Sequence, residues 1–257
     1  MKLAANKFLC FAALSFMVAA EGDGQDPRVG LKAGYLDAGA AARNMELVKT
    51  MPKPDGFFDP KAPAGPPTPP EADPNAPPAP PQQPAGTPAA PAPPGLNFAN
   101  SDIAFTRDRL IMGSFHGFNA YSIEDAGKAR LLASIVCPGG QGDVSVHGNL
   151  LFMSVEQTRG RIDCGAQGVQ PPVSAERFRG VRIFDISDLQ HPKQLAAVQT
   201  CRGSHTHTIV TDPKDKANLY IYGQGTGQVR PSEELSGCSG KDPKEDPQTA
   251  LFSIDVI

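Results

Sequence analysis

From Asn97 to Ile257 the chain consists of short runs of alternating apolar and polar residues, separated by Gly, Asp, Asn and Pro. Alternation of this kind predicts β-strands with one buried face, and the separating residues are typical of turns. The sequence therefore predicts an all-β domain over residues 96–257. The residues that precede it do not show this pattern.

The runs recur in a fixed order. Residues 117–135 align without a gap with residues 180–198, at an offset of 63 positions. Residues 102–115 align with residues 143–155 after one deletion, and with residues 207–223 after an insertion. Each copy gives four strands, and units of about 40 residues with four antiparallel strands are typical of β-propeller blades. The sequence thus predicts an incomplete β-propeller of about two and a half to three blades.

The last apolar run, residues 251–255, aligns with residues 181–185, which form the third strand of the second unit. We therefore expect the third blade to stop partway, which would leave unpaired backbone groups and an uncovered apolar face. On this interpretation the sequence is the front part of a longer propeller, of seven or eight blades, or a truncated gene product. An open solenoid of three blades, capped by the N-terminal segment, is the alternative.

Three segments resemble the motif of the LVIVD-repeat family of exported bacterial β-propellers. They are FNAYS at 118–122, VRIFD at 181–185 and LFSID at 251–255. The second copy continues with Ile-Ser-Asp at 186–188 and with His191 and Pro192, which is also similar, whereas the first copy has Ser122 where the motif has Asp. The resemblance covers residues 102–257. It implies a propeller fold and export, but no activity, since the family has no agreed one.

The N-terminus predicts export independently. Lys2 and Lys7 precede an apolar stretch that is too short to span a membrane comfortably and that ends in small residues at 18–20. We interpret residues 1–20 as a signal peptide that is cleaved after Ala20, and a buried N-terminal helix is the alternative. No transmembrane segment is expected once it is removed.

Two further segments precede the all-β domain. Residues 21–50 predict either a helix or, at 44–50, a strand that closes the propeller. Residues 51–95 hold 18 of the 27 prolines and few apolar side chains, which predicts a disordered linker with polyproline II character. Recognition of this stretch by a PxxP-binding domain is a weaker alternative.

Net charge and cysteine content narrow the partners and the compartment. Loss of Lys2 and Lys7 with the signal peptide changes the formal net charge from -3 to -5, which argues against a nucleic-acid partner. In an exported protein four cysteines favour two disulfides, and the repeat predicts Cys137 with Cys164 and Cys201 with Cys238. Each bridge would pin one of two long loops, 156–180 and 224–249. Free or metal-bound thiols are the alternative.

The segment RGSHTHTIVTD carries the sharpest chemical signal. Side chains alternate along a strand, so His205 and His207 are expected to point the same way and to be close enough to share a metal ion. The repeat alignment places His207 at the position of Asp102 and Asp143 on the innermost strands, with His147 as a third nitrogen donor. Hydrogen bonding of these side chains to neighbouring loops is the structural alternative.

Arginines gather in the two long loops and are a second candidate site. They could bind an anionic group, with solvated surface charge as the alternative; they are Arg159, Arg161, Arg177, Arg179 and Arg230.

No catalytic triad order, phosphate-binding loop or CxxC motif is present. The sequence therefore predicts a secreted or periplasmic scaffold that binds a small-molecule ligand or a protein. The alternative is an exported metal-dependent enzyme, an oxidase or a hydrolase, with a histidine-lined axial site. The substrate, the catalytic residues and the cofactor, beyond a transition metal, are not specified.

Overall fold

The structure is a computed structural model that describes residues 26–34, 37–51 and 100–257. The predicted signal peptide and all but the first residue of the predicted linker lie outside the described residues. In the stretches 26–34 and 37–51 no helix or strand forms, and Met45 and Leu47 are 81% and 77% exposed. The predicted helix is therefore absent from these residues, whereas the closing strand, which would pair with the last blade of a complete propeller, stays a prediction. A short apolar segment without a packing surface gains too little from burial to order its backbone.

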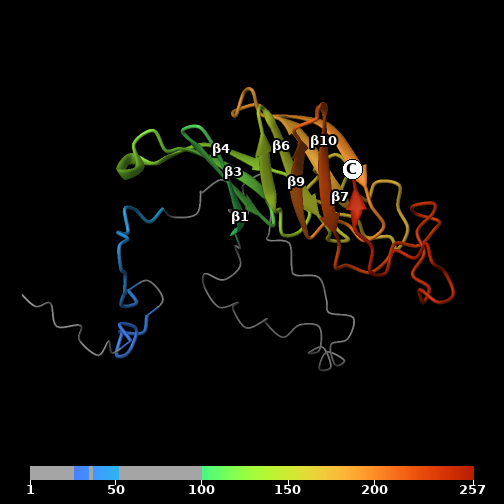
Figure 1. The fold of residues 1–257 in the computed structure, drawn as a ribbon, viewed down its shortest axis with the longest axis horizontal. Coiled ribbons are helices and arrows are strands. Elements are labelled where there is room, and N and C mark those ends of the chain that lie inside the picture. The colour runs from blue at the N-terminus through green and yellow to red at the C-terminus, as the bar shows by residue number, and fades with distance from the viewer. Residues whose placement is uncertain (1–25, 35–36, 52–99) are drawn as a thin grey trace, which may run out of the picture. The chain divides into compact units, whose positions relative to one another are not determined.

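Residues 100–257 fold into three antiparallel sheets (Figure 1). Sheet 1 has the order β1 (Asn100–Thr106), β2 (Arg109–Ser114), β3 (Gly117–Ser122), β4 (Arg130–Val136), with the 3-10 turn η2 (Ala126–Lys128) before β4. Sheet 2 has the order β5 (Val144–His147), β6 (Leu150–Val155), β7 (Gly180–Asp185), β8 (Lys193–Gln199). Sheet 3 has the order β9 (Thr206–Asp212), β10 (Asp215–Gln224), β11 (Asp255–Val256). The all-β prediction is confirmed for these residues, none of which forms a helix long and apolar enough to cross a membrane.

The first two sheets share one register in their first hairpins. β1 and β2 pair Ile103 with Met112, and β5 and β6 pair Val144 with Met153, so both partners move by 41 positions. The deletion that the sequence alignment introduced here is therefore not needed. This constant spacing means that each position of sheet 1 has a defined counterpart in sheet 2.

The third strands confirm the predicted offset of 63 positions. Gly117 and Gly180 begin β3 and β7 with φ angles of 137° and 146°. A Cβ atom on either glycine would lie 2.0 Å from a carbonyl oxygen of the fourth strand, that of Ile135 or Val198. Only glycine fits such a backbone approach, so the two glycines mark the same corner of two equivalent sheets.

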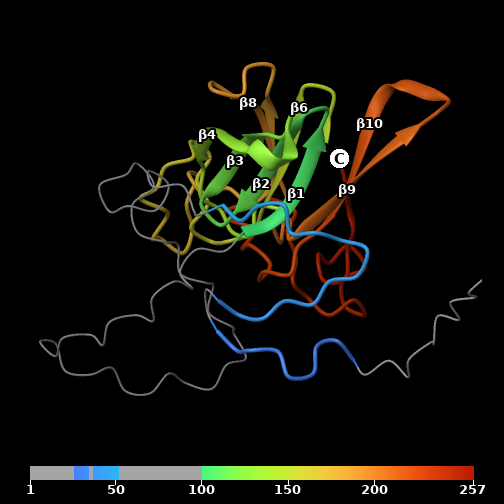
Figure 2. The same cartoon turned by 90° about the vertical axis from the view of Figure 1, so that its left-hand side faces the viewer.

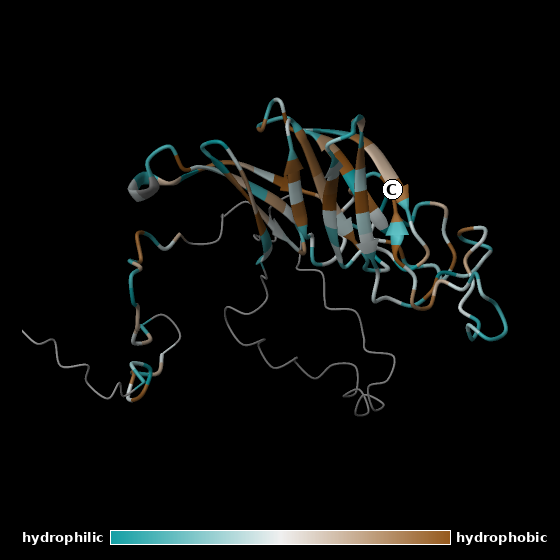
Figure 3. Ribbon diagram, in the orientation of Figure 1, coloured by the Kyte–Doolittle hydropathy of each residue, from teal (hydrophilic) through white to brown (hydrophobic). Residues whose placement is uncertain are grey.

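Apolar side chains pack each sheet against the next one, face to face. Figure 3 shows hydrophobic residues, in brown, along the strands of these sheets. The core between sheets 1 and 2 contains Ala104, Ile111, Phe118, Val144, Leu151, Met153 and Phe184. The core between sheets 2 and 3 contains Phe152, Val181 and Ile221, with Ile183, Ile209 and Ile257 packed against them. β6 is apolar at nearly every position because both of its faces are buried in this way.

The third strand of sheet 3 begins later than the sequence predicts. The predicted strand at 251–255 is wrong, since β11 is Asp255–Val256, and Ile257 extends the pairing through two backbone hydrogen bonds with Ile221 at 2.8 and 2.9 Å. Phe252 instead lies in a turn, with φ of 61° and 90% of its surface exposed. An alternating apolar pattern alone does not show whether another sheet or loop buries those side chains.

Candidate functional site

Two aspartates link the first strands of neighbouring sheets. The backbone N–H of Val144, in β5, donates to the carboxylate of Asp102, in β1. The backbone N–H of His207, in β9, donates to Asp143 Oδ2 at 2.9 Å. β5 and β9 are edge strands, so these two N–H groups point away from the only neighbouring strand in their sheet. The aspartate carboxylates of the preceding sheet satisfy them.

This arrangement corrects the predicted position of His207 by one residue. His207 is the counterpart of Val144, because the backbone N–H of each donates to an aspartate in the first strand of the preceding sheet. Thr206 therefore takes the place of Asp143. A shift of one residue moves a side chain to the opposite face of a strand. The His207 side chain accordingly lies against sheet 2, where it contacts Ser154.

The carboxyl groups of Asp102 and Asp143 also hydrogen-bond to each other. Burial, together with the neighbouring carboxylate, raises the pKa of Asp102. Burial alone would raise the pKa of Asp143 as well, but its hydrogen bonds with His207 outweigh burial and lower it. Asp143 is therefore the stronger acid of the pair, and Asp102 takes up a proton first as the pH falls.

His207 is held by two partners at one ring nitrogen, and its side chain is completely buried. Nδ1 lies 2.8 Å from Ser154 Oγ and 3.1 Å from Asp143 Oδ2. Since Asp143 is ionised, we assign the proton to Nδ1, which donates to that carboxylate; Ser154 in turn lies 2.8 Å from Ser204 Oγ. The other nitrogen, Nε2, is buried and has no hydrogen-bond partner among the described residues.

His205 is anchored in the same manner, two residues earlier in the chain. Its Nδ1 contacts Glu156 Oε1, and Glu156 Oε2 accepts from the backbone N–H and the hydroxyl of Thr226 at 3.1 and 3.0 Å. The His205 side chain is 30% exposed, and that of Glu156 is 10% exposed. We call His205, His207, Asp143, Ser154 and Glu156 the two-histidine cluster. Neither Ser154 nor Glu156 was singled out from the sequence, although their spacing of two residues matches that of the histidines.

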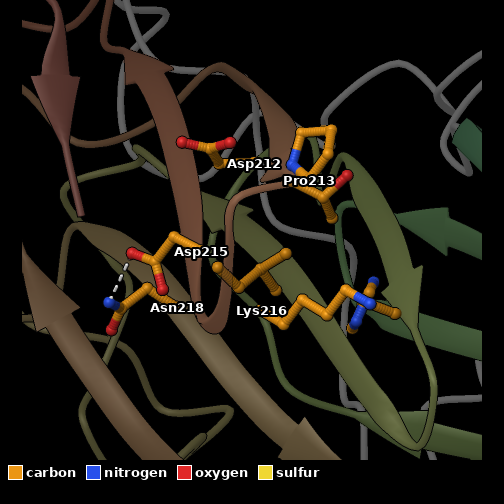
Figure 4. Close-up of a pocket in the computed structure, with 8 residues that line it drawn as sticks. Asp212, Pro213, Asp215, Lys216 and Asn218 are labelled. Carbon is orange, nitrogen blue, oxygen red and sulfur yellow. Dashed lines mark hydrogen bonds between the residues drawn. The ribbon is translucent and has the colours of Figure 1, made fainter.

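The structure does not bring His147 to this cluster. His147 lies at the far end of β5 and lines a pocket of about 300 Å³ with Asp212, Asp215 and Lys216 of the β9–β10 hairpin (Figure 4). The tip of this hairpin projects beyond the other strands in Figure 2. Residues 26–34, 37–51 and 100–257 contain no group of three or more His, Cys, Asp or Glu side chains placed to hold a metal ion, so the predicted three-histidine set is not assembled.

The two long loops lie where the sequence predicts them, after the second strands of sheets 2 and 3. Cys137 is bonded to Cys164 and Cys201 to Cys238, with Cα–Cα distances of 4.3 and 5.3 Å, so both predicted pairings are confirmed. Each disulfide ties a long loop to the connection that enters its sheet. In sheet 1 the counterpart of the long loops is the short turn between β2 and β3 that contains His116, whose pKa is lowered to about 4 by burial and by the charge of Arg159.

Four of the five predicted loop arginines are neither an open anion site nor solvated charge. Arg177 and Arg230, from different loops, both contact Glu234, and the three side chains are 6%, 2% and 1% exposed. Arg230 Nε donates to Glu234 Oε1 at 2.7 Å, and the backbone N–H of Ser174 donates to Oε2 at 2.9 Å. Arg177 also donates to the carbonyl of Thr158 at 2.7 Å. Glu234 thus joins the two loops through a buried ionic network.

Two further predicted arginines are also engaged within the protein. Arg161 is 10% exposed at its side chain and pairs with Asp163 and Glu176 at 2.8 and 2.7 Å. Arg179 is 2% exposed and donates to the carbonyl of Arg202 at 3.1 Å.

Sequence reasoning also missed Arg182, which is fully buried in β7. Its guanidinium lies 4.5 Å from the ring centroid of Phe178 and donates to Gln194 Oε1 at 2.8 Å. Burial lowers the pKa of Arg182 to about 10. Its place among the buried residues of a strand was the one available signal, and an arginine there is uncommon.

Comparisons with known proteins add no assignment. No protein-family model matches the chain, and no curated protein matches it.

Proposed function

We propose that this chain is an extracytoplasmic β-propeller-type scaffold whose two long loops bind a ligand or a protein partner. The observation that carries the proposal is the double fixation of both loops. Each is closed by a disulfide, and the buried Arg177–Glu234–Arg230 network joins one to the other. Loops that a rigid scaffold holds in one conformation are the usual site of recognition, because little entropy is lost on binding.

The propeller assignment is supported by the way in which the sheets repeat. β5 contacts both β1 and β9, so the first strands of successive sheets are neighbours. Ile103 and Phe105 are 44% and 63% exposed, although their counterparts Val144 and Val146 pack against the preceding sheet. A further sheet of the same kind would cover them, as in a ring of blades.

Export is supported by the disulfides. Two buried or half-buried cystine bridges persist in oxidising compartments and are rare in the cytosol. The resemblance to LVIVD-repeat proteins points in the same direction.

Site-specific photocrosslinking of the full chain in its native cell envelope tests the binding role. A photoreactive residue at Val173, a 45% exposed position of the first long loop, should give a discrete adduct. The same residue at Leu195, 58% exposed on β8, is the matched control and should give none. Removal of the Cys137–Cys164 bridge should weaken the Val173 adduct. Equal labelling from both positions would contradict recognition by the loops.

A further inference from the structure

We propose that the two-histidine cluster binds a divalent transition-metal ion through the Nε2 atoms of His205 and His207. This site lies between sheets 2 and 3, and it does not depend on the role proposed for the long loops. No catalytic step is attached to it.

The first argument is the way in which both imidazoles are oriented. His205 Nδ1 contacts Glu156, and His207 Nδ1 lies 3.1 Å from Asp143. Histidines that bind metal ions nearly always donate their second ring nitrogen to a carboxylate or carbonyl, which fixes the tautomer and makes the free nitrogen a better ligand. Both histidines have this orientation, and in both it leaves Nε2 as the donor.

The second argument is the state of His207 Nε2. It is a buried nitrogen without a hydrogen-bond partner among the described residues, on a side chain with no exposed surface. A buried polar atom left unpaired costs about 1–3 kcal/mol. A metal ion would satisfy this lone pair, and a second, partly exposed histidine beside it provides a route of entry.

The third argument is the shared direction of the two side chains. His205 and His207 contact residues of sheet 2 that are themselves two positions apart, Glu156 and Ser154. His205 lies in the bend just before β9, where its backbone N–H still donates to the carbonyl of Gln224 in β10 at 2.7 Å. Because Ser154 and Glu156 are two positions apart at the end of one strand, the contacts with them direct both imidazoles to the same side of sheet 2, where they could chelate one ion.

The chemistry of the donors selects the class of ion. Imidazole nitrogens suit zinc, copper and nickel, whereas calcium and magnesium prefer oxygen ligands. The carboxylates of Asp143 and Glu156 beside the rings offset the charge of a dication. With two protein ligands, the remaining coordination positions would be open to water or to an exogenous ligand, and the affinity should be lower than that of a closed four-ligand site.

Calorimetric titration of Cu²⁺, and separately of Zn²⁺, into the chelator-treated full chain with intact disulfides tests the proposal. We expect one ion per chain. His205→Gln and His207→Gln should each weaken binding by at least about tenfold, and Glu156→Gln, which changes an orienting residue, by roughly 10–100-fold. His191→Gln is the matched control, because His191 also pairs with a carboxylate, Asp188 at 2.9 Å, but is 78% exposed and stands alone.

Electron paramagnetic resonance of the Cu²⁺ complex gives a readout that a purely structural role would not move. Coupling to two imidazole nitrogens is expected in the parent protein, and to one nitrogen in His205→Gln. Because His205 is partly exposed, this variant should keep the parent's thermal unfolding temperature even if the buried His207 variant does not fold. Absence of binding by the parent, unchanged affinity in His205→Gln, or an equal loss in His191→Gln would each overturn the proposal.

Discussion

Replacing Glu234 by Gln removes the one negative charge that two buried guanidinium groups share. Arg177 and Arg230 would remain 6% and 2% exposed, and each would lose its ionic partner. The amide of Gln can still accept one hydrogen bond, but it cannot compensate two positive charges. Breaking a buried ion pair by removing one partner costs about 3–5 kcal/mol, because the remaining charge stays desolvated.

The assay is denaturant unfolding at pH 7 with the disulfides intact, and the matched control is Glu176→Gln. Glu176 is also a loop glutamate paired with an arginine, Arg161 at 2.7 Å, but its side chain is 64% exposed. An exposed pair contributes up to about 1 kcal/mol. We therefore expect Glu234→Gln to lower the free energy of unfolding by about 3–5 kcal/mol, and the control by about 1 kcal/mol or less.

The pH dependence gives a second check on the same residue. Burial opposes ionisation of Glu234, but the N–H of Ser174 and the two arginines outweigh it and lower its pKa. The stabilisation that ionised Glu234 gives the folded protein is therefore complete above its ordinary pKa of 4.5. It is lost as the pH falls through the lowered pKa of the folded state. The acid-side slope that Glu234 contributes should vanish in Glu234→Gln. If this variant loses no more stability than Glu176→Gln, the network does not hold the loops together.

Three other outcomes follow from the fold. The double change Cys201→Ser and Cys238→Ser opens a loop with a sequence separation of 37 and should cost about 4 kcal/mol in denaturant unfolding. Phe152→Ala, at a 2% exposed position between sheets 2 and 3, should cost about 3–5 kcal/mol, whereas Leu195→Ala, 58% exposed, should stay within about 0.5 kcal/mol. The pKa of Asp102 is raised in the folded protein, so ionisation of this group disfavours folding above its ordinary pKa of 3.8. Asp102→Asn should therefore unfold at neutral pH no more easily than the parent. A clear loss of stability in this variant would show that ionised Asp102 stabilises the fold instead.

The features that sequence could predict are those that local chemistry repeats. The strands of the first two sheets follow from their alternating pattern, and glycine at 117 and 180 marks two corners that admit no side chain. The disulfides follow from cysteines that stand at equivalent points of successive units, since loops on one end of a stack of sheets lie near each other. The strand pattern and the glycines depend on neighbouring residues, and the cysteine pairing depends on the repeat. Local pattern and repeat can both be recognised in a single sequence.

The features that sequence could not predict depend on pairs from distant segments. Glu234 and Arg177 lie 57 positions apart, and isolated charged residues are most often exposed, so nothing marks them as a buried pair. The strand expected at 251–255 failed for a related reason. Its apolar letters alternate correctly, but Phe252 has no surface to pack against. Alternation predicts a strand only where another face is present to bury it.

The one-residue error at His207 has a physical origin that also clarifies the candidate site. The repeat alignment grouped His207 with Asp102 and Asp143 on the innermost strands, but each aspartate instead accepts a backbone N–H from the first strand of the next sheet. An edge strand packed against another sheet needs such an acceptor, and a carboxylate at the strand's start supplies it. Their oxygens are therefore largely committed to structure. The same contact turns His207 towards sheet 2 and fixes its Nδ1. The atom left free to coordinate an ion is therefore the imidazole Nε2, and Asp143 orients the ring that carries it.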